Sequence, residues 1–150
     1  MTTDVTIKVR NNDYYDIAFT ANGDIETVPA LDTAILMSIL AEVRAAPSEM
    51  PESHRRRGWI GNESTRGIEM GSKAWLFEQA RITGSNLAEL SVIINNGLSW
   101  LVELDVAIAT SVNTYYRNGA VSVEVILTRS SSTVEKRFYE LWNNTGAYLR

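Results

Sequence analysis

Hydrophobic and polar residues alternate in the first part of the chain, which is the period of a half-buried β-strand. The alternation is clearest at Val5, Ile7 and Val9. A second alternating stretch leads to Asn22-Gly23, a pair that favours a tight hairpin turn because both residues tolerate positive φ. The pattern therefore predicts an N-terminal β-hairpin.

The middle of the chain has the spacing of α-helices. A helix is predicted over residues 31–46 after Pro29, and a short helix over residues 72–82 with Ser72 as its N-cap. Leucine and isoleucine recur at helical intervals over residues 86–102, which predicts a second long helix. A glycine inside that helix, Gly97, indicates close packing against a sheet. The first helix carries its apolar stripe at Ile35, Leu36, Ile39, Leu40 and Val43.

Alternation returns in the last third of the chain. Asn118-Gly119 is a second hairpin signal, and residues 134–142 predict a further strand after it. The predicted fold is α+β, with two main helices packed on a mostly antiparallel sheet, an N-terminal β-hairpin and a C-terminal β-meander. We expect a single domain over residues 1–150. The strand that follows the second turn has one apolar face at Val121, Val123, Val125 and Leu127.

Composition limits the classes of function. Of the 150 residues, 45% are hydrophobic and 21% charged, which is ordinary for a globular domain. The absence of cysteine excludes a disulfide framework, a thiolate zinc site and a cysteine nucleophile. No stretch approaches the roughly 20 apolar residues of a membrane span, and the N-terminus lacks a secretory signal, so we expect a cytoplasm-like compartment. The net charge of −4 disfavours a general nucleic-acid binder.

Residues that could carry chemistry are scattered. The single histidine, His54, lies beside arginines and is interpreted as a solvated loop residue. Asp24 and Glu26 share a strand face, and Glu103 and Asp105 flank a helix end. No spacing predicts the opposed carboxylate pair of a glycosidase. The sequence also lacks a serine-hydrolase elbow, a phosphate-binding loop and a dinucleotide motif. We therefore predict no catalytic, cofactor-binding or metal site.

The strongest remaining candidate is the arginine loop, which we define as residues 55–59. It contains Arg55, Arg56 and Arg57, followed by a glycine and Trp59. One interpretation is a solvated loop. A second is a contact to a protein partner, since arginine and tryptophan are enriched in interface hot spots. A third is a contact to nucleic acid. The other tryptophans lie among aliphatic residues and are predicted to pack in the core.

Several segments in order resemble a known family. They read YYDIAFTANGDIETV, LDTAILMSILAEVRA, RRRGWIGNE, MGSKAWLFE and SWLVELDVA. Over residues 14–142 the chain resembles the small baseplate wedge proteins, or sheath initiators, of contractile-tailed phages, with the Mu-like branch most similar. Many members carry a Glu-Pro-Arg triplet where this chain has Glu103-Leu104-Asp105, so only Glu103 is carried over. Arg57 is the candidate for the missing cation.

The resemblance implies a structural, non-enzymatic role. Family members are similar in fold to part of the tail sheath subunit and present a sheet edge onto which sheath arms add strands. Residues 121–129 and 134–142 are the strands suited to this. The implied interface residues are the arginine loop, Glu103, Val134, Lys136 and Phe138.

The resemblance also implies partners and a location. The partners would be the tail sheath protein and other baseplate wedge proteins, with tail tube or hub proteins as further contacts, in about six symmetry-related copies. The protein would lie in the tail baseplate of the virion after assembly in the host cytoplasm, without membrane or nucleic-acid contacts. Two other functions stay open here: a tail-associated peptidoglycan hydrolase of the lysozyme-like kind, and a small nucleic-acid-binding module that uses the arginine loop.

Overall fold

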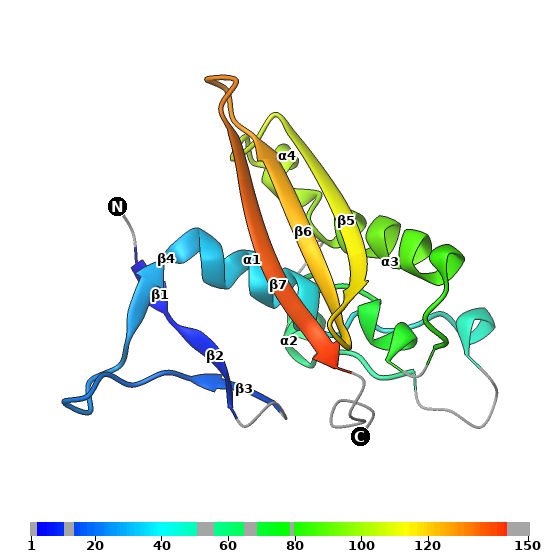
Figure 1. Cartoon of the computed structure of the whole chain (residues 1–150), viewed down its shortest axis with the longest axis horizontal. Coiled ribbons are helices and arrows are strands. Elements are labelled where there is room, and N and C mark those ends of the chain that lie inside the picture. Colours follow the sequence, from blue (N-terminus) through cyan, green and yellow to red (C-terminus); the bar gives the residue numbers. More distant parts are fainter. Residues whose placement is uncertain (1–2, 11–13, 51–55, 65–68, 79, 144–150) are drawn as a thin grey trace.

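The computed structural model describes residues 3–10, 14–50, 56–64, 69–78 and 80–143. They form an N-terminal β-ribbon, a helical middle part and a C-terminal three-stranded sheet (Figure 1), which confirms the predicted α+β class. In chain order the elements are β1 (Thr3–Val5), β2 (Ile7–Arg10), β3 (Tyr14–Ile17), β4 (Thr27–Pro29), α1 (Ala30–Leu40), α2 (Gly61–Ser64), α3 (Gly84–Gly97), α4 (Trp100–Glu103), β5 (Ala109–Arg117), β6 (Ala120–Thr128) and β7 (Val134–Asn143), with 3₁₀ turns at Pro47–Glu49 and Ala74–Phe77.

The N-terminal ribbon is built around one stretch, residues 3–10, that pairs with two different strands. β1 pairs antiparallel with β4, and β2 pairs antiparallel with β3. Thr6 lies at the junction: its N–H donates to the carbonyl of Glu26 at 2.8 Å, and its carbonyl accepts from the N–H of Ala18 at 2.9 Å. Beyond the junction the predicted hairpin continues to a turn in which Gly23 has a φ of 87°. The ribbon is therefore a hairpin whose two arms are bridged by the first strand of the chain.

Helix α1 ends at Leu40, earlier than its apolar stripe predicts. The chain becomes extended after Leu40 because its backbone N–H groups form hydrogen bonds to two segments that are distant in the sequence. The N–H of Val43 donates to the carbonyl of Ser72 at 3.0 Å. The N–H of Ala45 donates to the carbonyl of Arg56, also at 3.0 Å. These bonds replace the intrahelical bonds that a longer helix would have made.

Ser72 precedes a much shorter helical segment than predicted. The chain forms one 3₁₀ turn, Ala74–Phe77, with Lys73 at the N-cap, so the predicted helix and its cap are both wrong. Ser72 Oγ still accepts from the N–H of Ala74 at 3.1 Å, and it donates to the carbonyl of Ile39 at 2.7 Å. The second bond fixes the turn to α1.

The long helix predicted over residues 86–102 is two helices, α3 and α4, separated by a short break. Gly97, where α3 ends, is a point of close approach, although its neighbours are not in the sheet as predicted. A Cβ added there would lie 2.7 Å from the carbonyl oxygen of Gly71 and 3.2 Å from that of Ser38. The bare backbone of Gly97 thus allows α3 to touch both α1, at Ser38, and the Gly71-Ser72 segment that precedes the 3₁₀ turn.

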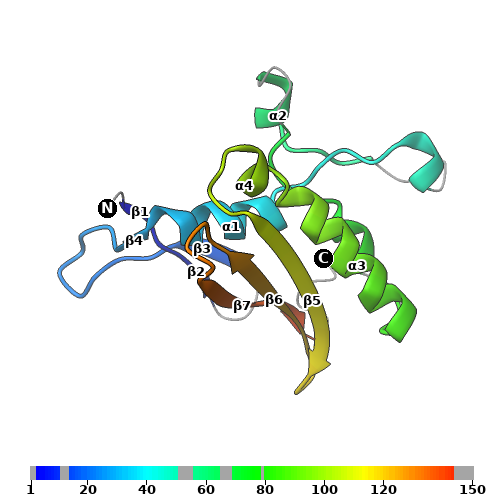
Figure 2. The ribbon, with the colours of Figure 1, turned by 90° about the horizontal axis from the view of Figure 1, so that it is seen from above.

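β5, β6 and β7 form an antiparallel meander with β6 in the centre. Asn118 and Gly119 join β5 to β6 with φ values of 53° and 80°, as a two-residue hairpin turn of the predicted kind requires. Figures 1 and 2 show α1 and α3 on the same face of this sheet, with α1 toward β7 and α3 toward β5. The predicted meander and the two helices packed on it are confirmed.

The core lies between α1, α3 and the inner face of the sheet. Trp75 is buried, as predicted, and its Nε1 donates to the carbonyl of Val43 at 2.9 Å. Trp100 is half-buried, and its Nε1 donates to Ser38 Oγ at 2.9 Å. The side chain of Trp142 lies outside the described part. The largest buried apolar side chains are Ile35, Ile39, Leu90, Ile94, Leu98, Leu101, Val121, Val123, Val125, Leu127 and Leu141.

Candidate partner-binding surfaces

Arg57, a predicted partner-contact residue, is engaged within the protein itself. Its guanidinium lies 4.9 Å from the ring centroid of Trp75 and pairs with Glu42 at 3.0 Å and Glu78 at 3.2 Å. Burial raises the pKa of Glu78, and the positive charge of Arg57 opposes that rise because it favours the ionised carboxylate. Arg57 therefore fixes the arginine loop to two other segments, the one after α1 that contains Glu42 and the one that contains Trp75 and Glu78.

Arg56 is also bonded internally. Its Nε donates to the carbonyl of Ala45 at 2.6 Å, and its own carbonyl accepts from the N–H of Ala45 at 3.0 Å. The third arginine of the loop, Arg55, lies outside the described residues, as does the preceding His54. Where the arginine loop is described, its two arginines stabilise the fold by contacts that the sequence pattern did not predict.

Trp59 is an exposed large apolar residue of the arginine loop. Its side chain is 40% exposed, and that of the next residue, Ile60, is 76% exposed. Met70 is exposed as well, and its N–H and carbonyl bond to the side-chain amide of Asn62 at 2.8 and 2.9 Å. Figure 2 shows that α2, which begins directly after Ile60, projects from the rest of the molecule. We call Trp59, Ile60 and Met70 the α2 tip.

Glu103, carried over from the resemblance, is the exposed last residue of α4. Within the described part of the chain its carboxylate has neither an ion pair nor a hydrogen bond. Arg57 is the residue expected above to supply the missing cation, but the structure pairs it with Glu42 and Glu78 instead. The role of Arg57 as the missing cation and a partner contact of Glu103 both stay predictions.

β7 is an edge strand, and two contacts give the direction of its backbone groups. The N–H of Arg129 donates to the carbonyl of Thr133 at 2.9 Å, so the backbone carbonyl of Thr133 points toward β6. Tyr15 Oη donates to the carbonyl of Glu140, so Glu140 faces away from β6. The backbone N–H and C=O groups of successive residues in a strand point alternately to one side and to the other. The outward N–H and C=O groups between these two points therefore belong to Val134, Lys136 and Phe138.

We call residues 134–138 the β7 edge. Its outward backbone groups have no hydrogen-bond partner among the residues that the structure describes. Val134 and Phe138 are 56% and 68% exposed. The second edge of the sheet is β5, whereas β6 is paired on both sides. The expectation that residues 121–129 receive a strand is therefore wrong, because that strand has no unpaired side.

The outer face of the sheet holds a buried charge that the sequence did not reveal. Glu124, in the middle of β6, is only 6% exposed. Its carboxylate accepts from Asn113 Nδ2 at 3.0 Å and Tyr115 Oη at 2.8 Å, and pairs with Lys136 Nζ at 3.1 Å. These bonds, with that from Asn113 the strongest influence, lower the pKa of Glu124 to about 2. Such a carboxylate stays ionised and bonded, which suits a structural role better than acid catalysis.

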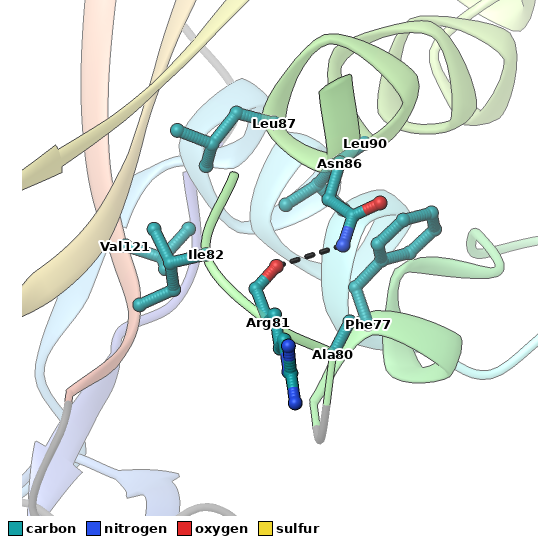
Figure 3. Close-up of a pocket in the computed structure, with 8 residues that line it drawn as sticks. All are labelled: Phe77, Ala80, Arg81, Ile82, Asn86, Leu87, Leu90 and Val121. Atoms are coloured by element: carbon teal, nitrogen blue, oxygen red, sulfur yellow. Dashed lines mark hydrogen bonds between the residues drawn. The ribbon is translucent and has the colours of Figure 1, made fainter. Parts of the chain in front are cut away.

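The pocket in Figure 3 is too small for a substrate. It lies between Phe77, Leu87 and Val121, beside the bond from Asn86 Nδ2 to the carbonyl of Arg81 at 2.7 Å. Its volume of about 20 Å³ is room for about one water molecule. In the described ranges, histidine, aspartate and glutamate form no group of three or more that could hold a metal ion. Nor does any helix described here have the length and apolar character needed to cross a membrane.

Comparison with known proteins places the chain in a family. Residues 31–134, more than half of the chain, match the family model described as phage protein GP46. The chain belongs to the phage protein GP46 family. It is also 26% identical over 113 residues to the Mu-like prophage FluMu protein gp46 of Haemophilus influenzae, a match that covers 73% of this chain and 76% of that relative. The GP46 match confirms the predicted relation to Mu-like phage proteins.

Proposed function

We propose that this GP46-family protein is a structural part of a contractile phage tail baseplate. In this role it joins wedge proteins and templates the first ring of the tail sheath by strand addition to the β7 edge. Membership of a phage protein family and similarity to a Mu-like prophage protein support a virion role. The observation that carries the finer proposal is the β7 edge, whose outward backbone groups have no partner in the described part of the chain.

The β7 edge fits strand addition in length and chemistry. Five residues of strand span about 17 Å, enough for an incoming strand to bond at three outward positions. Val134 and Phe138 offer exposed apolar contacts on the outer face, on either side of Lys136. Lys136 places a charge in the middle of the edge, which limits aggregation of the monomer before assembly.

The second edge, β5, is the less suitable acceptor. Two of its side chains are committed to α3: Thr110 Oγ1 donates to Asn95 Oδ1 at 3.0 Å, and Thr114 Oγ1 donates to the carbonyl of Leu87. β5 lacks a pair of strongly exposed apolar side chains like that of the β7 edge. We assign the contact to other wedge proteins to the α2 tip and Glu103, which lie away from β7.

The test is co-assembly with the sheath protein of the same phage, followed by electron microscopy and co-purification. Lys136→Pro removes one outward N–H while leaving the bonds between β6 and β7 in place, since proline is tolerated at such edge positions. We expect sheath rings to fail with Lys136→Pro and to form normally with Lys136→Ala, which removes only the side chain.

Tyr116→Pro is the matched control on the other edge, because Tyr116 also directs its N–H away from β6. Circular dichroism and thermal unfolding would establish that each variant is folded. If Tyr116→Pro blocks assembly and Lys136→Pro does not, the sheath strand adds to β5 and the proposal is wrong. Normal assembly of both proline variants would exclude strand addition to this sheet altogether.

A further inference from the structure

The β7 edge carries a row of three exposed side chains on the outer face of the sheet. Val134 and Phe138 are 56% and 68% exposed, and Lys136, with a side chain that is 55% exposed, lies between them. These three residues also direct their backbone N–H and C=O groups away from β6. An added strand would therefore place one residue directly opposite each of them, with the two Cβ atoms about 5 Å apart.

Phe138 is the most exposed aromatic side chain among those that the structure describes. Its partner across the ladder to β6 is Glu124, an ionised carboxylate and not an apolar side chain. On the other side of Phe138 lies the free edge of the described sheet. Pairs of an aromatic with a β-branched or aromatic residue stabilise neighbouring strands. An apolar residue opposite Phe138 is therefore favoured, and the same reasoning applies at Val134.

Lys136 keeps binding capacity after its contact with Glu124. Its Nζ pairs with one carboxylate oxygen of Glu124 at 3.1 Å, and an ammonium group has three donors. The other oxygen of Glu124 accepts from Asn113 and Tyr115, so that carboxylate is bonded at both oxygens. An acidic residue opposite Lys136 would accept one of the remaining donors. A lysine or arginine there would place like charges directly opposite each other, which is destabilising.

The charges on the inner face of β7 make no comparable demand on a partner. Glu135 pairs with Arg129 and with Arg137, each at 3.1 Å, and Arg137 also pairs with Asp32. Glu140, the next residue of the outer face, lies beyond the β7 edge, where its carbonyl accepts from the ribbon. Selection of a strand by charge therefore falls on the outer-face row.

We propose that the β7 edge selects its partner strand by the pattern apolar, acidic, apolar at three alternate positions, opposite Val134, Lys136 and Phe138. This inference rests on the proposed strand addition and adds a requirement for the partner sequence. The two apolar side chains cover Val134 and Phe138, and the carboxylate bonds to Lys136 Nζ. The pattern reads the same in both directions, so it holds for a parallel and for an antiparallel strand. Main-chain bonds supply affinity for any strand, while the pattern selects one.

The first experiment measures the binding of three capped pentapeptides to the intact protein by amide NMR, at millimolar peptide. The reference peptide is Ile-Thr-Glu-Thr-Ile, the second has lysine at its centre, and the third has serine at both ends. We expect the reference peptide to shift the amide signals of residues 134–138. It should bind about fivefold more tightly than the lysine peptide and about tenfold more tightly than the serine peptide. Equal binding of the three peptides, or no binding, would overturn the inference.

Two variants assign these preferences to particular side chains, once thermal unfolding has shown that they are folded. Lys136→Gln removes the charge but can still donate to Glu124, and it should bind the glutamate and lysine peptides equally. Phe138→Thr keeps a strand-forming residue without the ring, and it should bind the reference peptide about threefold more weakly. Tyr116→Thr, the control, removes an exposed aromatic ring from β5 and should change nothing. If both preferences persist in the first two variants, the inference is wrong.

Sheath co-assembly separates this inference from strand addition itself. An exposed ion pair contributes a factor of about two to five, so rings still form with Lys136→Ala. Phe138→Thr should raise the sheath concentration needed for rings by about threefold. If Lys136→Pro blocks assembly and Phe138→Thr assembles like the wild type, selection by the row fails while strand addition stands. If Lys136→Pro assembles normally, strand addition itself fails.

Discussion

Replacement of Gly97 by alanine tests whether the close approach of α3 to α1 shapes the fold. Alanine is the better helix former by about 1 kcal/mol, so a helix with open surroundings would gain stability. Here the new methyl carbon would lie 2.7 Å from the carbonyl oxygen of Gly71 and 3.1 Å from Ser72 Cβ. The nearest neighbour is backbone and cannot rotate away. Overpacking of this kind costs about 1–3 kcal/mol, so after the gain in helix propensity we expect a net loss of up to about 2 kcal/mol.

The assay is urea denaturation together with thermal unfolding, where each kcal/mol corresponds to about 2–4 °C in a chain of this size. Gly84→Ala is the matched control, because Gly84 begins the same helix and an added Cβ would have no atom within 4 Å. We expect the control to gain about 0.4–1 kcal/mol. If Gly97→Ala is as stable as the control, the contact between α3 and the Gly71 turn does not constrain the molecule as described.

Two further predictions concern the ion pairs. The lowered pKa of Glu124 means that its contribution to stability is present above its ordinary value of 4.5 and is lost as the pH falls toward about 2. Thermal unfolding of wild type and Glu124→Gln should therefore differ most above pH 4.5 and converge toward pH 2, and parallel curves would contradict the bonded carboxylate. Arg57→Ala should destabilise the protein by about 1–2 kcal/mol in urea denaturation, from the stacking on Trp75 and two ion pairs. Arg57→Lys should recover only part of that loss, and unchanged stability with impaired assembly would instead show that Arg57 serves a partner.

Local chemistry explains which elements the sequence predicted well. The Asn118-Gly119 turn and the alternation on β6 were correct because both signals depend on neighbouring residues only. Helix α1 was predicted too long because Val43 fits the apolar stripe. Its N–H is bonded instead to Ser72, a residue far along the chain. Such a tertiary bond overrides a weak local preference and leaves no trace in the helical period.

In the candidate surfaces too, the features set by neighbouring residues were predicted and those set by tertiary contacts were not. Trp59 was recognisable as exposed because it lies in a loop, whereas the internal roles of Arg56 and Arg57 depend on segments brought beside them by folding. The partners of Glu124 come from the two neighbouring strands, so only the strand register brings them together. A hollow beside β7 is lined by both Thr6 and Tyr139, from opposite ends of the chain, and no local pattern could have linked them.

The bond from Tyr15 to the carbonyl of Glu140 has a consequence for symmetry in the assembly. It fixes the N-terminal ribbon at one end of the β7 edge. In the proposed strand addition, the ribbon would be a physical stop for the incoming strand. A slip of one residue would turn every inward side chain outward. With such a stop, the register of the incoming strand on β7 would be set by the position at which that strand meets the ribbon. In a ring of copies, every sheath strand would then add in the same register. The regularity of the ring would depend on the position of the Tyr15 hydroxyl.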